Sequence, residues 1–270
     1  MQLQKNYSLT ELNTLRLLST AATLVDLTNL PQLHEIAQYL NETNSKFLVL
    51  GGGSNVILPE YYNGVVIHNK LSGIEQVDRD SKSVLIKAMA GVEWDYFVEY
   101  TLEHKWYGLE NLSLIPGTVG ASPIQNIGAY GVEVGQFIEH VEIYDTIEQR
   151  FKYIMHKDCE FSYRNSLFKS KPHYIVVAVA FRLLIEPKLN LTYKDIAKQL
   201  AQLENTTPKI LRNVVIKIRT EKLPDPKVIG NAGSFFHNPI VTANTLDQLL
   251  KTYPEIPHYQ FVQNSKFQSA

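Results

Sequence analysis

IPGTVGASPIQNIGAYG, at residues 115–131, is the most informative stretch of this chain. It contains four glycines and several other small residues, and it has no charged side chain. Glycine permits left-handed backbone and close contact, while alanine and serine keep side chains out of the way. The composition predicts that a planar or phosphorylated group lies against this backbone. The alternative, a run of tight turns between two strands, stays open for the glycine spacing alone.

A second glycine-rich stretch, LVLGGGSNVIL at residues 48–58, places three glycines, 51–53, between two apolar runs. The pattern predicts a strand, a loop and another strand. Consecutive glycines expose main-chain N–H groups that form an anion-binding nest, to which Ser54 and Asn55 add hydrogen-bonding side chains. The loop has neither the Lys-Ser/Thr pair of a P-loop nor a GxGxxG pattern. We therefore expect a diphosphate site of another kind.

The two stretches together resemble the flavin-binding segments of the UDP-N-acetylenolpyruvoylglucosamine reductase family of bacterial cell-wall enzymes. Three further stretches resemble other signatures of that family in the same order: FSYRNSLFK at 161–169, LTYKDI at 191–196 and TEKLPDPKVIGNAGSFFHNPIV at 220–241. The resemblance implies the FAD-binding fold shared with vanillyl-alcohol oxidase (PCMH type), in two lobes. It also implies non-covalent FAD, NADPH as reductant and UDP-N-acetylglucosamine enolpyruvate as substrate, for peptidoglycan precursor synthesis.

Two residues receive catalytic roles from the resemblance. Arg164 is implied to stabilise the developing enolate, which suits a guanidinium because its donors form a fixed fork. On the residues alone, a structural ion pair or a surface cation is the commoner role, and we expect an acidic partner. Ser234 is implied to donate the proton. A serine is a weak acid, so this role requires groups that stabilise the alkoxide, and a turn-capping serine is the alternative.

The remaining site residues are implied to bind ligands, and no metal site is predicted. Tyr193, Lys222 and Asn238 are implied to contact the substrate, with the lysine and tyrosine serving its diphosphate or NADPH. Without the resemblance, Tyr193 is equally explained as a half-buried aromatic and Lys222 as a solvated cation at a helix end. The residues implied to bind FAD are Gly51, Gly52, Gly53, Ser54, Asn55, Pro116, Gly117, Gly120, Ala121, Ser122, Asn126, Ile127, Gly128, Tyr130 and Gly131.

Composition excludes some classes of function. The 270 residues carry a net charge of −1, so there is no footprint for nucleic acid or an anionic membrane. The single Cys159 excludes an internal disulfide, and we interpret it as structural. The N-terminus lacks a basic region followed by an apolar run, and no stretch approaches 18 uninterrupted apolar residues. We expect a cytoplasmic monomer without membrane insertion.

Apolar periodicity predicts an α+β protein, because strands are scattered among a few helices. We expect a first FAD-binding lobe at 1–70, a second at 71–221 and an incomplete α+β substrate-binding domain at 222–270. The predicted strands are 21–30, 65–69, 83–91, 140–145, 150–155 and 174–184, and the predicted helices are 31–43, 92–105, 193–203 and 208–223.

The end of the chain departs from the resembled family. Its members continue past the region matching 262–270 and supply a glutamate that works beside the arginine and the serine. No acidic residue occupies that motif here, because Glu255 belongs to a different stretch. We therefore expect a reductase with impaired catalysis. The alternative is a weakly catalytic flavin- or sugar-nucleotide-binding relic, and a different flavin oxidase is disfavoured by the 220–241 stretch.

Overall fold

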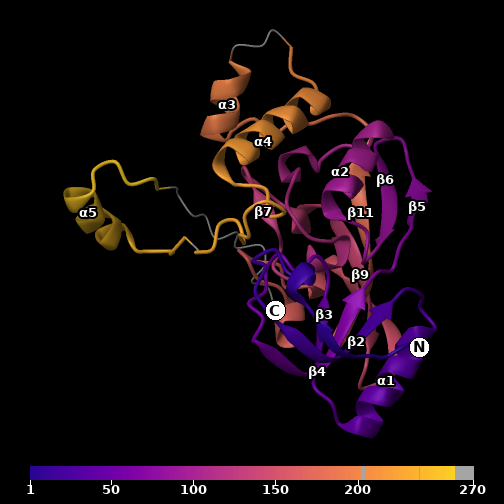
Figure 1. The fold of residues 1–270 in the computed structure, drawn as a ribbon. Helices are drawn as coiled ribbons and strands as arrows, with labels where there is room; N and C mark the ends of the chain where they lie inside the picture. Colours follow the sequence, from indigo (N-terminus) through magenta and orange to yellow (C-terminus); the bar gives the residue numbers. More distant parts are fainter. Residues whose placement is uncertain (202–204, 237, 259–270) are drawn as a thin grey trace. The chain divides into compact units, whose positions relative to one another are not determined.

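The computed structural model describes residues 1–201, 205–236 and 238–258, and the chain forms two compact units, Met1–Ala232 and Gly233–Ala270. Both sheets described below belong to the first unit, and helix α5 (Ala243–Thr252) belongs to the second (Figure 1). The first sheet uses residues 4–69 and the larger sheet residues 74–184. The lobe boundaries at 70 and 221 stay predictions about how the cofactor and substrate parts divide.

The first sheet has the order β1-β2-β4-β3, from Gln4–Ser8, Thr20–Leu27, Tyr61–Asn69 and Phe47–Leu50. Strands β2, β4 and β3 are parallel, and β1 is antiparallel to β2. Alternate residues of β2 and β4 face helix α1 (Gln32–Thr43), which buries its apolar stripe on that side. The predicted helix 31–43 is confirmed, and it ends at Asn44 in the left-handed conformation typical of a helix C-terminus.

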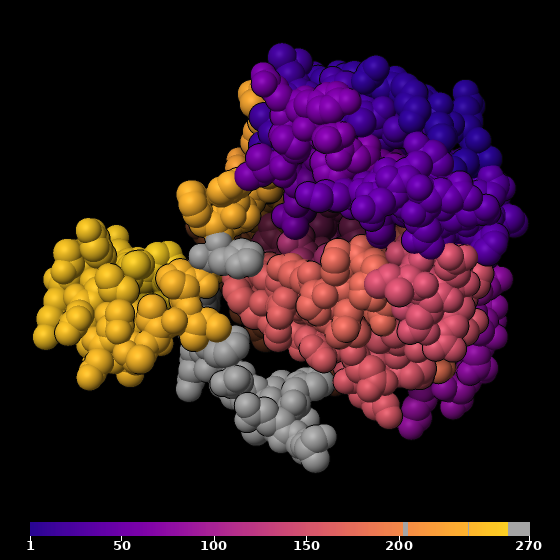
Figure 2. Space-filling model, turned by 90° about the horizontal axis from the view of Figure 1, so that it is seen from below, coloured from indigo at the N-terminus to yellow at the C-terminus, as the bar shows by residue number. Residues whose placement is uncertain are grey.

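The second sheet has the order β10-β9-β11-β6-β5, from Arg150–Met155, Ile138–Asp145, Tyr174–Leu184, Ser83–Met89 and Ile74–Arg79, all antiparallel. Strand β11 is buried on both faces. Its residues Val179 and Phe181 belong to the core under helix α2, while Ile175 and Val177 pack with α1 and the first sheet. Seen from below, the first sheet (indigo to violet) and β9 to β11 (pink to orange) form adjoining masses of the first unit (Figure 2).

Helix α2 (Trp94–Glu103) covers the second sheet with aromatic side chains. The ring centroids of Phe97 and Phe181 are 4.9 Å apart, and Trp94 lies 6.0 Å from each. The Trp94 indole N–H donates to the carbonyl of Leu112 at 2.8 Å. The N-terminus of α2 is capped by Glu93, whose carboxylate accepts from a main-chain N–H of the first turn. The aromatic core thereby fixes the start of α2 next to the second glycine stretch.

Helices α3 (Lys194–Leu200) and α4 (Pro208–Lys222) pack on each other at the end of the first unit opposite α1 (Figure 1). Thr207 caps α4, and Pro208 occupies the first turn, where its missing N–H costs nothing. The shared core consists of Ile196, Leu200, Leu211, Val214, Val215 and Ile218. The apolar periodicity predicts both helices. Of the predicted 193–203, residues 202–203 lie outside the described part.

Some elements differ from the prediction. The apolar run 56–58 is not a strand: Ile57 is 67% exposed, Leu58 turns into a small core, and Pro59 offers no N–H to a sheet. The elements that the sequence does not predict are β1, the part of β4 before residue 65, β5, the short strands β7 (Gly128–Ala129) and β8 (Val132–Glu133), and α5. Strand β1 escapes prediction because four of its five residues are exposed and show no alternation.

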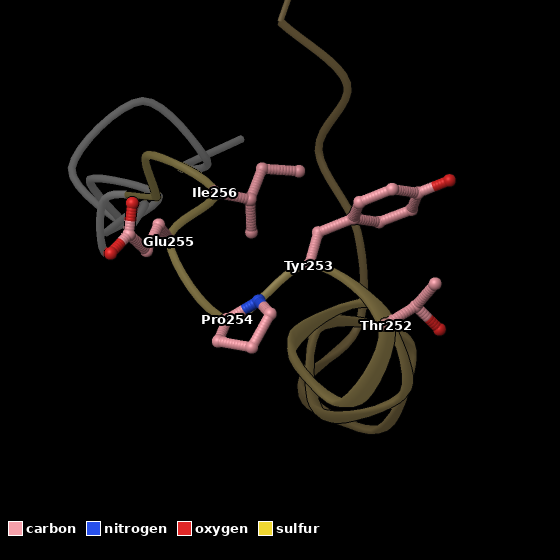
Figure 3. Close-up of a pocket in the computed structure, with 5 residues that line it drawn as sticks. All are labelled: Thr252, Tyr253, Pro254, Glu255 and Ile256. Atoms are coloured by element: carbon pink, nitrogen blue, oxygen red, sulfur yellow. The ribbon is translucent and has the colours of Figure 1, made fainter.

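In the second unit, Thr242 caps α5 through its hydroxyl, which accepts from the N–H of Thr245. The chain then turns at Tyr253, and the carbonyl of Tyr253 accepts from Ile256 at 3.1 Å. Residues Thr252 to Ile256 border a cavity of about 620 Å³ (Figure 3). Among the described residues, only these five consecutive ones border it, and no side chain from another described element joins them. None of the predicted site residues takes part.

Candidate functional site

The two glycine-rich stretches lie directly against each other. The Ser54 hydroxyl donates to the carbonyl of Pro116 at 2.9 Å. A Cβ atom on Gly52 would lie 2.9 Å from the Cα of Gly117, closer than real Cβ contacts come. The absence of side chains therefore lets the two backbones touch. Part of the surface that the sequence predicts against 115–131 is the other glycine stretch.

Gly53 packs against the turn at residues 12–14, which precedes β2, and only glycine leaves room for that turn. Its φ angle is +62°, and a Cβ there would lie 1.9 Å from the Leu12 carbonyl oxygen. The N–H of Thr14 donates to the Gly53 carbonyl at 3.1 Å. The turn is held by Asn13, a buried amide that bonds the carbonyls of residues 9, 10 and 17. No other residue type fits at position 53 without moving this turn.

The loop that follows β3 presents a row of main-chain donors. Among the residues that the structure describes, no protein acceptor pairs with the N–H groups of 51–55. The Asn55 amide reaches across to Gln125 at 2.8 Å and ties this loop to the second glycine stretch. Successive unpaired N–H groups in a glycine loop form an anion-binding concavity. The geometry fits the predicted diphosphate nest.

The second stretch is organised by Asn126, which is 1% exposed. Its amide donates to Glu133 at 2.8 Å and to the carbonyl of Ser162 at 3.0 Å, and its oxygen accepts from Gly135. One buried side chain thus joins 115–131 to strand β8 and to the loop that carries Arg164. Buried polar groups satisfied in this way fix their surroundings.

Arg164 lies over the hairpin that ends the second stretch. Its guanidinium Nη2 donates to the Gly128 carbonyl at 2.6 Å, and a Cβ on Gly128 would lie 2.8 Å from its Nη1. The hairpin turns at Tyr130 and Gly131, both with positive φ, which suits a two-residue turn between antiparallel strands. Gly128 therefore provides room for the arginine, so two predicted site residues meet here.

The acidic partner that the sequence predicts for Arg164 is not found. In the described part of the chain no carboxylate lies within 4 Å of its guanidinium. Burial raises the pKa of Glu133, which the Asn126 amide and the more distant Arg164 cation oppose. The prediction of an acidic partner is therefore wrong for the described residues, because the Gly128 carbonyl, and not a carboxylate, accepts from the guanidinium. Its charge is available for an anionic ligand.

Beside this hairpin lies a group that we call the polar cluster: Tyr130, Tyr193, Asp195, Arg219 and Lys222. The tyrosine rings meet edge to face at 5.1 Å, and the Arg219 guanidinium lies near enough to the Tyr130 hydroxyl to affect its pKa. Lys222 Nζ lies 2.5 Å from Asp195. Burial raises the pKa of Tyr130, so its phenol stays protonated at neutral pH although Arg219 and Lys222 oppose this shift. Cations and phenol donors together suit phosphate oxygens.

Ser234 and Asn238 belong to the second unit and are described within it. Ser234 is exposed and follows Gly233, whose φ angle is +65°. The two phenylalanines after it meet edge to face at 5.2 Å, and Phe236 is 84% exposed. The predicted sharp backbone is present at Gly233, but Phe235 and Phe236 are exposed and form no buried wall around Ser234. Its role as a proton donor stays a prediction.

Comparisons with known proteins bear on this site. The profile of the FAD binding domain family matches residues 21–147. The UDP-N-acetylenolpyruvoylglucosamine reductase of Neisseria gonorrhoeae is 44% identical over 256 residues, 93% of this chain and 74% of that protein. The enzyme of the same name from Porphyromonas gingivalis W83 is 40% identical over 265 residues, 96% of this chain and 78% of that protein. The chain belongs to the UDP-N-acetylenolpyruvoylglucosamine reductase family.

The fold agrees with the family. The crystal structure of UDP-N-acetylenolpyruvylglucosamine reductase from Thermus caldophilus matches with a TM-score of 0.62 at 22% identity, covering 92% of this chain and 80% of that one. With the FAD domain match, this confirms the predicted α+β fold of FAD-binding type. This reductase-family chain is a flavin-dependent oxidoreductase. It is shorter than the two curated relatives and spans about three quarters of their length.

The residues of this family member fit FAD. The nest at 51–55 offers main-chain donors to a diphosphate, and the Ser122 hydroxyl is buried without a hydrogen-bond partner among the described residues. A buried unpaired hydroxyl is costly unless a ligand or water completes it. The Thr14 hydroxyl, next to Gly53, is in the same state. Unpaired polar groups therefore occur in each glycine stretch, at the N–H groups of 51–55 and at the Ser122 hydroxyl, as expected of residues that bind FAD.

Other groups play no part in this site of the reductase-family chain. Cys159 is fully buried, and burial raises the pKa of its thiol to about 12, which agrees with the structural interpretation. In the described ranges, no three His, Cys, Asp or Glu side chains gather where they could hold a metal ion. Within the same ranges, no helix has the length and apolar character needed to span a membrane.

Sequence reasoning misses two members of the polar cluster, Arg219 and Asp195. Arg219 lies three residues before Lys222 on α4, so helical spacing alone indicates that the two share a face. Asp195 is two residues from Tyr193, in the first turn of α3. Its contact with Lys222 depends on how α3 and α4 cross, which no local pattern contains.

Proposed function

We propose that this chain reduces UDP-N-acetylglucosamine enolpyruvate to UDP-N-acetylmuramate with NADPH as reductant and bound FAD as the redox group, in peptidoglycan precursor synthesis. Family membership and the paired glycine stretches support the flavin chemistry. UDP-sugars and NADPH are cytoplasmic metabolites, so we place the reaction in the cytoplasm. We keep a monomer as part of the proposal.

The observation that carries the proposal is the state of Arg164. Its guanidinium is anchored to the Gly128 carbonyl, at the end of the second glycine stretch, and has no carboxylate partner in the described part of the chain. A cation in this state pairs with the carboxylate of the enolpyruvyl group. As negative charge builds on the adjacent carbon, the same fixed donors stabilise it, which lowers the barrier.

The protein's other residues bind and protonate. When bound, the flavin supplies hydride chemistry, accepting reducing equivalents from NADPH and passing them to the vinyl group. We propose that Ser234 donates the proton to the other carbon and that Asn238 contacts the substrate. Tyr193 and Lys222, with Tyr130 and Arg219 beside them, form hydrogen bonds to the substrate diphosphate or the phosphates of NADPH.

The test separates the two half-reactions under anaerobic conditions. NADPH should bleach the visible absorbance of the bound flavin, and UDP-N-acetylglucosamine enolpyruvate should restore it with formation of UDP-N-acetylmuramate. Ser234→Ala should leave the bleaching intact and slow the restoration roughly 100-fold. Bleaching by NADPH without any product from the enolpyruvyl substrate would show a flavoprotein with another substrate.

A further inference from the structure

Leu114 is the residue at which the chain enters the second glycine stretch, and Ser113 separates it from the turn η2 (Glu110–Leu112). Its φ angle is +57°. This left-handed region is unfavourable for leucine, because the Cβ atom crowds the following carbonyl. Leu114 therefore needs partners that hold its main chain in this conformation.

Both main-chain groups of Leu114 are bonded to charged side chains. Its N–H donates to Asp95 Oδ1 at 2.5 Å, and its carbonyl accepts from Arg219 Nε at 3.1 Å. Asp95 lies in the first turn of α2, and Arg219 lies in the last turn of α4. Two helices that are far apart in sequence thus hold one residue, α2 through its N–H group and α4 through its carbonyl.

A second arginine of α4 secures the first partner. Arg212 binds Asp95 through both guanidinium ends, at 2.6 and 2.9 Å, and only 8% of its side chain is exposed. Two-pronged bonds of this kind are strong and directional. Burial acts to raise the pKa of Asp95, but Arg212 and the Leu114 N–H outweigh it and leave the pKa lowered. Asp95 therefore stays ionised at neutral pH. We call Asp95, Arg212 and Arg219 the Leu114 clamp.

The conformation of Leu114 sets the course of residues 115–117. Two residues on, the Pro116 carbonyl accepts from Ser54, and the Gly117 carbonyl accepts from the Trp94 N–H at 3.0 Å. These bonds join the second glycine stretch to the first and to the start of α2. A change of φ at Leu114 would redirect residues 115–117 and pull the two stretches apart.

We propose that Asp95 and Arg212 are positioning residues, which hold Leu114 left-handed and thereby keep the two glycine stretches in the arrangement that binds FAD. The inference rests on the proposed function for the identity of the ligand. Helix α4 then contributes to both parts of the proposed site. Its last turn supplies Arg219 and Lys222 to the polar cluster, and Arg212 and Arg219 hold Asp95 and the Leu114 carbonyl next to the second glycine stretch.

The first measurement is FAD affinity, followed by quenching of flavin fluorescence on addition of apoprotein. Arg212→Met removes the two-pronged contact and should raise the Kd for FAD roughly tenfold or more. Asp95→Asn keeps an acceptor for Leu114 but loses the charge, so its effect should be smaller and in the same direction. Glu99→Gln is the matched control. Glu99 lies 3.9 Å from Arg212 and is 58% exposed, and Leu114 bonds to Asp95 and Arg219 instead, so the Kd of this variant should stay within twofold.

The second measurement is a rescue. Asparagine adopts left-handed φ more readily than leucine. Leu114→Asn added to Arg212→Met should recover most of the lost FAD affinity. Asparagine at position 114 adopts the left-handed conformation by itself and no longer needs the clamp. An ion pair that only holds α2 to α4 would not be rescued, since the introduced asparagine restores nothing between the helices. Far-UV circular dichroism and thermal unfolding show that each variant is folded.

The outcomes separate the two proposals. If the parent chain binds FAD but Arg212→Met and Asp95→Asn bind it within twofold of the parent, the positioning role is wrong. Failure of Leu114→Asn to rescue a folded Arg212→Met protein overturns it as well. If Arg212→Met does not fold, the same comparison is made between Asp95→Asn and the double variant that combines Asp95→Asn with Leu114→Asn. A parent chain that binds no FAD contradicts the proposed function itself.

Discussion

The proposed cofactor side and the proposed substrate side of this site are built differently, one from main chain and the other from side chains. The glycine stretches at 51–55 and 115–131 present main chain, and their fit depends on missing side chains: a Cβ on Gly52 or Gly53 meets backbone within 3 Å. The polar cluster presents side chains from the β7–β8 hairpin, α3 and α4, with Lys222 57% and Asp195 38% exposed. A site made of backbone tolerates almost no substitution, whereas a site made of partly exposed side chains can be adjusted by degrees.

The largest effect is expected at Gly53. Gly53→Asp places a Cβ within 2 Å of the Leu12 carbonyl and adds a negative charge to the anion nest, so the purified variant should contain no FAD. The measurement is flavin content after gel filtration. Gly73→Ala is the control. Gly73 directly precedes β5 and has a φ angle of +134°, and a Cβ there meets only the Met89 side chain at 3.5 Å, so this variant should lose thermal stability and keep its flavin. Stoichiometric FAD in purified Gly53→Asp would contradict the proposal that the nest at 51–55 binds the FAD diphosphate.

The same difference explains what the sequence could predict. Glycine clusters and long apolar strands are local patterns, and their structural meaning is fixed by sterics. Strands β10 and β11 therefore match their predicted bounds, and the two glycine stretches meet as expected of one binding site. The strand predicted at 56–58 failed because a short apolar run also suits a loop that buries one side chain.

The rest depends on long-range packing. The contact of Arg219 with Tyr130, the Asp195–Lys222 pair and the clamp around Leu114 each join residues that lie 19 or more positions apart in the sequence. No local pattern states which charged side chains meet across such distances. Even the left-handed φ of Leu114 is invisible in the sequence, because leucine is among the residues least expected there.

Arg164 joins the two sides, and its loss should be smaller than the loss of the nest. Arg164→Lys keeps the charge but cannot keep the guanidinium fork that bonds Gly128 and that we propose binds the substrate carboxylate. Loss of one charge-assisted hydrogen bond predicts a roughly 10- to 100-fold slower reoxidation of the flavin by the enolpyruvyl substrate. Flavin content and reduction by NADPH should be unchanged. If both half-reactions slow equally, Arg164 supports the hairpin rather than the reaction.

A still smaller effect is expected in the polar cluster. Asp195 neutralises Lys222 in an exposed pair, and such pairs contribute at most about 1 kcal/mol. Asp195→Asn should free Lys222 and remove a repulsive charge, so UDP should bind up to about fivefold more tightly, with a steeper salt dependence. Isothermal titration with UDP measures this. Glu221→Gln, which removes an exposed charge 4.0 Å from Lys217 on the same helix, is the control and should change little. Weaker UDP binding in Asp195→Asn would mean that the carboxylate orients Lys222 instead of competing with the ligand.

The smallest functional effect is expected at Cys159, which tests whether the loop carrying Arg164 opens in the native state. The carbonyl of Cys159 accepts from Leu167 at 2.8 Å and closes that loop, and the thiol is fully buried. Burial raises the pKa of the thiol to about 12, whereas an unfolded cysteine ionises near about 8.5. A raised folded-state pKa gives stability that is complete below the unfolded pKa and is lost as the pH rises toward the folded one. Between about pH 8.5 and about pH 12 this thiol should therefore lower the free energy of unfolding by up to about 1.4 kcal/mol per pH unit.

Two measurements check this prediction. Urea unfolding at pH 7.5 and pH 9.5 should show the pH dependence in the parent chain and a smaller one in Cys159→Ala. A disulfide reagent at pH 8 should label the parent chain only as fast as the protein unfolds. Rapid labelling under native conditions would show that the loop opens by itself, so the fixed position of Arg164 would then depend on bound substrate rather than on the fold.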